Sequence, residues 1–287
     1  MRDGDIWTRS LPPSIVLGEQ PEYRQDAIRE ACRILDADSD GEARYSERHG
    51  TIGIALRHRD GSSSWLKLAQ VSTRFEEWLR GGELAIRAID GVPTPEILRQ
   101  FECISSGIKW HALQLSLAPS PVVLAQSWIA RPLETIDDRW LEQLKRAVDA
   151  IGKSPLARWS VHPGRVARLI GRRFGRSAPY TVDEWRTAHG DLQWSNLTAP
   201  NLMLLDWEYW GAAPRGFDAA TLLSHSFMDP ALFRRIETIF TEDLDTPSGI
   251  VARLFQFSRI LAEIEAGTRD PREHRVAEAE ARKLLRR

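Results

Sequence analysis

Cysteine is almost absent from this chain: Cys32 and Cys103 are the only two among 287 residues. Two cysteines cannot build a disulfide framework, and their spacing matches no zinc cluster. An excess of charge is missing too, because 39 Lys and Arg residues face 40 Asp and Glu residues, for a formal net charge of −1. A chain without surplus positive charge has no general attraction for nucleic acid or for an anionic membrane. We therefore expect neither as a partner.

Long apolar runs are lacking as well. The one long uncharged stretch, residues 112–130, contains three Ser, two Gln and two Pro residues, which are unsuited to a lipid environment. We interpret it as two strands, 112–117 and 122–128, joined by a Pro-Ser-Pro turn. The first residues of the chain carry charges where a signal peptide needs an apolar segment. We therefore expect a cytoplasmic protein.

The composition that remains is that of a globular protein, with 42% hydrophobic and 28% charged residues. Its length exceeds that of an ordinary single domain and predicts two lobes. In the first part, apolar spacing predicts helices over 23–35 and 75–89, the second weakened or interrupted by Gly81-Gly82. The β-like runs 51–56 and 65–68 flank an Asp-Gly-Ser turn and predict a hairpin.

The second part of the chain is mainly helical in pattern. Apolar residues over 140–151 lie on one helical face. Asp229-Pro230 and Asp270-Pro271 each place a capping carboxylate before a proline, and Ser248 is a candidate cap for the apolar series that follows it. We therefore expect an α+β protein with a β-rich N-terminal lobe (1–126) and a mostly helical C-terminal lobe (127–287).

The residues most suggestive of chemistry lie between positions 189 and 208. His-Gly-Asp-Leu-Gln-Trp-Ser-Asn, residues 189–196, is followed by a turn, a short apolar strand and then Asp206-Trp-Glu. A loop and a hairpin of this kind can direct Asp191, Asn196 and Asp206 into one cavity. Asn196 and Asp206 offer the oxygen ligands that suit Mg²⁺ with bound water and phosphate. Asp191 is then left to accept a proton from a substrate hydroxyl.

This segment resembles the aminoglycoside phosphotransferase and choline kinase family, a branch of the protein-kinase-like fold. The family signature is His-Gly-Asp followed by Asn five residues after the Asp, and then a strand that ends in Asp-Trp or Asp-x-Glu. The resemblance implies that Asp191 is the catalytic base and that Asn196 and Asp206 hold Mg²⁺. It also implies that Asp218 supports the backbone of the catalytic loop.

The resemblance extends outward over roughly residues 45–225. Lys67 resembles the strand lysine that holds nucleotide phosphates, and Glu83 resembles the helix residue that pairs with it. The nucleotide base is expected to form hydrogen bonds with the backbone near Gln126 and Trp128, between the lobes. The resemblance therefore implies a small-molecule kinase that transfers the γ-phosphate of ATP or GTP to a hydroxyl of an antibiotic-like or other small polar acceptor.

Two features of the sequence keep other functions open. The loop 46–51 is not rich in glycine, which favours an alternative in which the chain is a catalytically silent, pseudokinase-like nucleotide-binding or regulatory protein. Residues 153–176 contain seven basic residues and no acidic one. Such a segment most often forms a solvent-exposed helix face, but it could also bind an anionic acceptor or, as the weakest alternative, nucleic acid.

Individual residues also leave alternatives. We interpret His189 as a structural group of the loop, and Glu208 as either a ligand of metal or substrate or a solvent-facing residue. Of the eleven tryptophans, Trp194, Trp207 and Trp210 lie nearest the signature. They are candidates for an aromatic site for a quaternary ammonium group, although core packing is the more common role.

Overall fold

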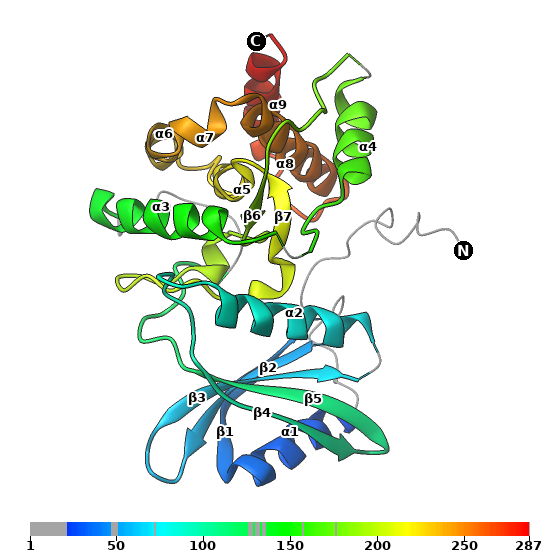
Figure 1. Ribbon diagram of the computed structural model, residues 1–287, viewed down its shortest axis with the longest axis vertical. Helices are drawn as coiled ribbons and strands as arrows, with labels where there is room; N and C mark the ends of the chain where they lie inside the picture. The colour runs from blue at the N-terminus through cyan, green and yellow to red at the C-terminus, as the bar shows by residue number, and fades with distance from the viewer. Residues whose placement is uncertain are drawn as a thin grey trace.

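The computed structural model describes residues 22–46, 51–71, 73–125, 129, 133, 136–156, 158–175 and 177–286. A twisted sheet with two helices forms one end of the molecule, and a mostly helical part forms the other (Figure 1). This is the expected α+β, bilobal arrangement. The division at residue 126 stays a prediction, because residues 126–128 lie outside the described part of the chain.

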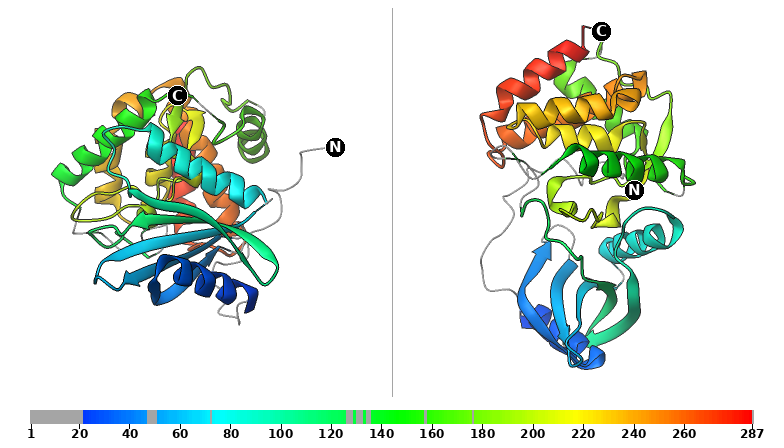
Figure 2. Two further views of the ribbon diagram at one scale, coloured as in Figure 1. Left: turned by 60° about the horizontal axis from the view of Figure 1, so that its bottom comes forward. Right: turned by 90° about the vertical axis from the view of Figure 1, so that its left-hand side faces the viewer.

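The sheet is antiparallel and has five strands in the order β1-β2-β3-β5-β4. Their bounds are β1 Ala37–Ser46, β2 Thr51–His58, β3 Ser63–Gln70, β4 Ile97–Ser105 and β5 Ile108–Ser116. Alternation along β3 divides its side chains between two cores: Leu66 and Leu68 join the core that includes helix α1 (Glu22–Leu35), and Ala69 joins the one that includes helix α2 (Arg74–Ala88). The two helices lie on opposite sides of the sheet (Figure 2).

Most elements expected in this part are present. The helix over 23–35 and the hairpin over 51–68 are confirmed. The expected interruption at Gly81-Gly82 is wrong, because α2 continues through both glycines. The expected strand 122–128 is wrong for its described residues, since Val122 forms only an isolated bridge with Thr198. Strand β5 already pairs with β3 on one edge and β4 on the other, so the segment that follows β5 cannot pair with β5 itself.

The helical part surrounds the long helix α8, most of whose residues are buried. Its helices are α3 Asp138–Lys153, α4 Pro163–Phe174, α5 Phe217–Ser224, α6 Pro230–Ile239, α7 Thr241–Leu244, α8 Pro247–Glu265 and α9 Glu273–Leu284. A two-stranded ribbon of β6 (Trp185–Ala188) and β7 (Gly211–Pro214) carries the segment between positions 189 and 210. Two 3₁₀ turns lie in that segment: η1 Trp194–Asn196 and η2 Trp207–Tyr209. No helix among the described residues is long and apolar enough to cross a membrane.

The helix starts agree with the sequence in one of three cases. Asp229 accepts a hydrogen bond from the backbone N–H of Leu232 at 3.0 Å and caps α6 as expected. The expected cap of α8 is wrong: Thr246 holds that position, and Ser248 instead accepts bonds from the backbone of residues 183 and 184. Asp270-Pro271 forms a turn, and α9 begins at Glu273.

Helix α2 connects the two parts of the molecule. Ala85 and Ile89, at its C-terminal end, belong to the large core of the helical part. A Cβ atom on Gly82 would lie 3.2 Å from the backbone carbon of Trp207, so the helix passes very close to η2. Gly82, one of the two glycines expected to weaken the helix, is therefore what allows α2 to approach this turn.

Candidate active site

The loop that carries the sequence signature is held by Asp218, in the first turn of α5. Its two carboxylate oxygens accept hydrogen bonds from the backbone N–H groups of His189 and Gly190, at 2.7 and 3.0 Å. Gly190 has a φ of 86°, and a Cβ atom there would collide with the backbone oxygen of Tyr209. The expected supporting role of Asp218 is confirmed by these contacts.

His189 is fully buried and also holds the loop together. Its Nε2 lies 2.9 Å from the backbone oxygen of Leu205, and its Nδ1 accepts a bond from the backbone N–H of Asp191 at 3.3 Å. Burial lowers the pKa of His189 to about 4, although the bond to Leu205 opposes this. A neutral imidazole that donates from Nε2 and accepts at Nδ1 fits both contacts. His189 is thus the structural group that the sequence suggested.

Asp191 and Asn196 are in direct contact. The side-chain nitrogen of Asn196 donates to the backbone oxygen of Asp191 at 2.9 Å and to its carboxylate at 3.1 Å. Gln193 donates to the same carboxylate oxygen at 3.2 Å. These bonds use the nitrogen of the Asn196 amide, which leaves its side-chain oxygen as a ligand atom.

Asp206 is brought back to this loop by a short hairpin. The backbone N–H of Leu205 donates to the carbonyl of Asn196 at 2.9 Å, and residues 197 and 204 form a single bridge rather than the expected strand. Asp206 has φ 67° and ψ 61°, a left-handed conformation that few residues other than glycine adopt. Such conformations persist where the surrounding structure fixes them, and they are concentrated at functional sites.

Lys67, from the middle of β3, contacts both acidic residues that follow the hairpin. Its ammonium group donates to the carboxylate of Asp206 and, at 2.9 Å, to that of Glu208. Glu208 is 4% exposed, so it is neither a free surface residue nor a group distant from the site. The structure thereby joins residues separated by about 140 positions in the sequence.

Burial and mutual charge set the protonation of this cluster. Burial raises the pKa of Asp191 to about 7, and the nearby charge of Asp206 acts in the same direction. Burial and Asp206 also raise the pKa of Glu208. Burial alone would lower the pKa of Lys67, but the two carboxylates outweigh it and raise that pKa. Perturbed groups that face one another in this way are typical of functional sites.

Glu83, the expected partner of Lys67, has other contacts among the described residues. It accepts bonds from Arg87 at 3.2 and 3.3 Å, and its other carboxylate oxygen lies 3.9 Å from Nε2 of His111. The carboxylates found at Lys67 are those of Asp206 and of Glu208, for which the sequence left the role open. The Asp-x-Glu spacing was the available signal, but only the fold shows which acid reaches the lysine.

Other expected site residues lie outside the described part of the chain. Gln126 and Trp128 are among them, and so are residues 47–50 of the loop between β1 and β2. Trp194, Trp207 and Trp210 are described and are at most 4% exposed. They pack in the core of the helical part, which makes them unavailable as walls of an open aromatic cage.

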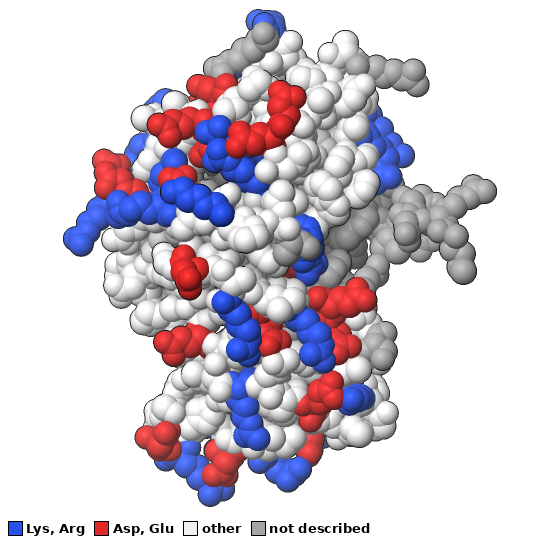
Figure 3. All heavy atoms as spheres, in the orientation of Figure 1, with Lys and Arg blue, Asp and Glu red and all other residues white. Residues whose placement is uncertain are grey.

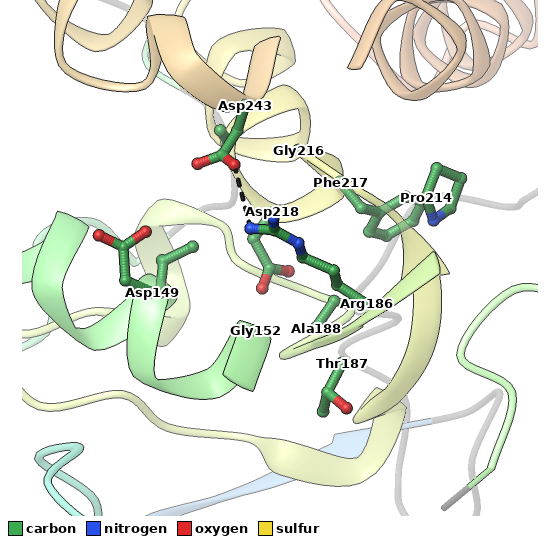
Figure 4. A pocket seen from close by; sticks show the side chains of 12 residues that line it. Asp149, Gly152, Arg186, Thr187, Ala188, Pro214, Gly216, Phe217, Asp218 and Asp243 are labelled. Carbon is green, nitrogen blue, oxygen red and sulfur yellow. Dashed lines mark hydrogen bonds and ion pairs between the residues drawn. The ribbon is translucent and has the colours of Figure 1, made fainter. Parts of the chain in front are cut away.

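A small hollow lies behind the loop that carries Asp191. It has a volume of about 30 Å³ and lies among α3, β6 and the start of α5, with Asp149, Arg186, Asp218 and Asp243 in its wall (Figure 4). Arg186 and Asp243 form an ion pair across it at 3.4 Å. Ligand pockets for small molecules measure several hundred Å³. This hollow has room for about one water molecule and is no site for a nucleotide or an acceptor.

The basic residues of positions 153–176 have different surroundings. Arg173 pairs with Glu265 on α8 at 2.7 Å, and Arg165 lies over the ring of Phe255. Arg158 packs its guanidinium against Gly81 of α2. On the face seen in Figure 3, positive and negative side chains are mixed in the sheet part and at the left of the helical part, whereas those at the right edge of the helical part, where Figure 1 places α4, are positive. Three of the described basic residues of this segment are therefore in contact with other elements of the chain.

The fold is shared with antibiotic phosphotransferases of known structure. A macrolide 2′-phosphotransferase from Brachybacterium faecium is 17% identical, with a TM-score of 0.54, and the match covers 92% of this chain and 98% of that one. The GDP and kanamycin complex of APH(2″)-IIia is 14% identical, with a TM-score of 0.58 and the same coverage. A spectinomycin phosphotransferase determined with ADP and spectinomycin is 12% identical, with a TM-score of 0.52, over 87% of this chain and 88% of that one.

Comparison by sequence found no match. No protein-family model matches the chain, and no curated protein matches it. At such low identity the structural likeness defines the fold alone. The chain has the protein-kinase-like fold of the aminoglycoside and macrolide phosphotransferases, as its sequence signature suggested.

Proposed function

We propose that this protein is a small-molecule kinase that transfers the γ-phosphate of ATP or GTP to a hydroxyl group. One observation carries the proposal: Lys67 of the sheet reaches Asp206 and Glu208 of the helical part, next to the loop of Asp191 and Asn196. Phosphoryl transfer needs positioning and neutralisation of phosphate charge more than covalent chemistry by the protein. A lysine, an amide oxygen, a metal-binding carboxylate and a separate base supply these functions.

The donor set fits Mg²⁺. Asn196 offers an amide oxygen and Asp206 a carboxylate, and a hard cation with open positions takes such ligands together with phosphate. Bound there, Mg²⁺ would neutralise phosphate charge. Lys67 binds the nucleotide phosphates as a point charge, and Glu208 holds the lysine in place. The choice between ATP and GTP stays open, since neighbouring structures contain GDP in one case and ADP in another.

Asp191 accepts the proton of the acceptor hydroxyl in this proposal. Its carboxylate is oriented by Asn196 and Gln193, and its pKa of about 7 places it near the value that suits a general base at neutral pH. His189 is not available for that role, because both ring nitrogens are used within the loop. The acceptor is then a small hydroxylated molecule, for which kanamycin and spectinomycin, found in the neighbouring structures, are the first candidates to test.

The proposal is tested by transfer of labelled γ-phosphate to a panel of hydroxylated antibiotics, sugars and amino alcohols. Replacement Asp191→Asn should lower turnover by roughly 10²- to 10⁴-fold, the contribution of a general base, while nucleotide still binds. Asp138→Asn, at an exposed residue that begins α3, is the matched control and should leave turnover unchanged. Near-normal turnover of Asp191→Asn would show that another group is the base.

A catalytically silent, nucleotide-binding protein is the second candidate. The loop over 46–51 favours it, because that loop lacks the glycines that usually cover nucleotide phosphates. The same experiment separates the two: nucleotide binding without transfer to any acceptor, and without slow hydrolysis, would favour the silent protein.

A further inference from the structure

His111, on β5, is a buried side chain that the proposed reaction does not use. It is 1% exposed, and neither of its ring nitrogens has a hydrogen-bond partner among the described residues. It lies on the same face of the sheet as Leu113 and Leu115, which pack in the core beneath α2. A buried imidazole without partners is unusual, because buried polar groups are nearly always satisfied by protein, water or an ion.

Carboxylates surround this imidazole from two elements. Glu102 is the cross-strand neighbour of His111, from β4, and Glu76 comes from the first turn of α2. One ligand atom from each of the three residues lies within 4.8 Å of the other two. Glu83, two turns along α2 from Glu76, adds a carboxylate oxygen 3.9 Å from Nε2 of His111.

We propose that His111, Glu76 and Glu102 form a binding site for a divalent transition-metal cation of the Zn²⁺ type, separate from the Asp191–Asp206 site. Imidazole with carboxylates is a ligand set for such cations, whereas Mg²⁺ and Ca²⁺ prefer oxygen ligands alone. Glu83 is close enough to complete the set or to orient the imidazole ring.

Protonation of His111 does not compete with this role near neutral pH. Burial lowers the pKa of His111, and the positive charge of Arg80 acts in the same direction against the nearby glutamates. The ring is therefore neutral at pH 7, which is the form in which imidazole binds a metal.

The positively charged side chain of Arg80 lies between Glu76 and Glu102, two of the proposed ligands. Its guanidinium lies 2.8 Å from Glu76 and 3.2 Å from Glu102, whose other carboxylate oxygen lies 2.5 Å from the ammonium group of Lys109. The Arg80 side chain is 42% exposed, so it can turn outward into water when a metal binds. Arg80 is thus a competitor of the metal, and this distinguishes a metal site from an ordinary surface ion-pair network. Removing Arg80 should strengthen metal binding, whereas it would weaken a simple ion-pair network.

A metal at this position would link α2 to β4 and β5. The same helix contacts η2, next to Asp206, through Gly82. The cation would therefore fix the helix that borders the proposed catalytic residues.

The test is calorimetric titration of the metal-free full chain with ZnCl₂. The wild-type protein should bind one Zn²⁺, and His111→Ala and Glu102→Gln should each weaken that binding by roughly tenfold or more. Arg80→Gln should bind more tightly than wild type. His274→Ala, at a histidine on α9, is the matched control and should bind as wild type does. MgCl₂ in place of ZnCl₂ should give no binding at this site.

Two further measurements keep the result interpretable. Thermal denaturation shows whether each variant is folded, and Glu102→Gln alters a partly exposed side chain, so it tests the site even if His111→Ala does not fold. The titration is repeated with Asp206→Ala, in which Zn²⁺ binding should persist. Any of three results would overturn the proposal. Zn²⁺ binding could be lost in Asp206→Ala, it could be weaker in Arg80→Gln than in wild type, or it could be unchanged in both His111→Ala and Glu102→Gln.

Discussion

Ionisation of the Asp191 carboxyl group is less favourable in the folded protein than in the unfolded chain. Its pKa rises from an ordinary 3.8 to about 7, so between these values the folded chain binds a proton that the unfolded chain has released. The free energy of unfolding therefore falls as the pH rises from about 4 to about 7. The buried Asp191 carboxylate, in the ionised form that acts as a base, therefore lowers the free energy of unfolding at neutral pH.

This cost can be measured with Asp191→Asn, which keeps the shape of the side chain and cannot ionise. The variant should melt at a higher temperature than wild type at pH 8, and the difference should disappear towards pH 4. Thermal denaturation over this pH range checks the prediction. A variant less stable than wild type at pH 8 would mean that the carboxylate is satisfied by its partners rather than strained by burial.

Glu208 and Glu83 differ in their relation to Lys67, although both are buried. Glu208→Gln should lower kcat/KM for the nucleotide by about tenfold, because a charged hydrogen bond to Lys67 is lost. Glu83→Gln should change it by less than about twofold, since Glu83 contacts Arg87 and His111 instead. Steady-state kinetics with varied nucleotide decide the matter. A larger effect at Glu83 would restore the helix carboxylate as the partner of the lysine.

At the residue scale, the sequence predicted those site residues that lie close together in a local signature. Asp191, Asn196 and Asp206 lie within sixteen positions of one another, and their order and spacing were enough to group them. The acid that reaches Lys67 could not be chosen in the same way. That choice depends on contacts between β3, α2 and η2, which are distant in the sequence and which no local pattern specifies.

Helix α2 shows how an element can contradict its intrinsic preference. Two consecutive glycines cost roughly 0.5–1 kcal/mol each relative to alanine within a helix. The helix forms nonetheless because Leu79, Ala85 and Ile89 bury an apolar face on both sides of the glycines. The packing therefore decides the secondary structure here, and propensity alone gave the wrong prediction of an interruption.

The two glycines should respond differently to replacement by alanine. Gly82→Ala should lower turnover without raising stability, because the added Cβ meets the backbone of Trp207 and Glu208 at 3.2 and 3.3 Å. Gly81→Ala should be neutral or stabilising by up to ~1 kcal/mol, since its Cβ meets only the movable guanidinium of Arg158. Thermal denaturation and turnover of both variants test this. Equal behaviour of the pair would show that α2 does not determine the position of η2.

Strands were harder to predict than helices. Strand β1 includes Asp38, Asp40 and Gly41, residue types that are depleted in strands, and it forms because it can pair with β2. The segment after β5 has a strand-like composition, but both edges of β5 are already paired with β3 and β4. Pairing between distant segments decides both cases. Helix patterns such as residues 140–151 succeed because the helix buries one face of its own periodic sequence.

At the scale of the whole molecule, the proposed site is made by contact between the two parts. Lys67 comes from the sheet, whereas Asp191, Asn196, Asp206 and Glu208 come from the loops of the helical part. The site holds one basic residue and three acidic ones, and binding of a metal with nucleotide phosphates adds charge of both signs. Ligand binding should therefore stabilise the complete molecule rather than one part of it.

The central claim, a metal-dependent nucleotide site formed by Lys67, Asn196 and Asp206, is tested most directly without any knowledge of the acceptor. Thermal denaturation is measured with ATP or GTP, with and without Mg²⁺, for wild type and Asp206→Ala. At a nucleotide concentration of about 100 times Kd, the account predicts a stabilisation of about 2.7 kcal/mol that needs Mg²⁺ and is lost in the variant. No stabilisation by either nucleotide, or the same stabilisation in Asp206→Ala, would contradict it.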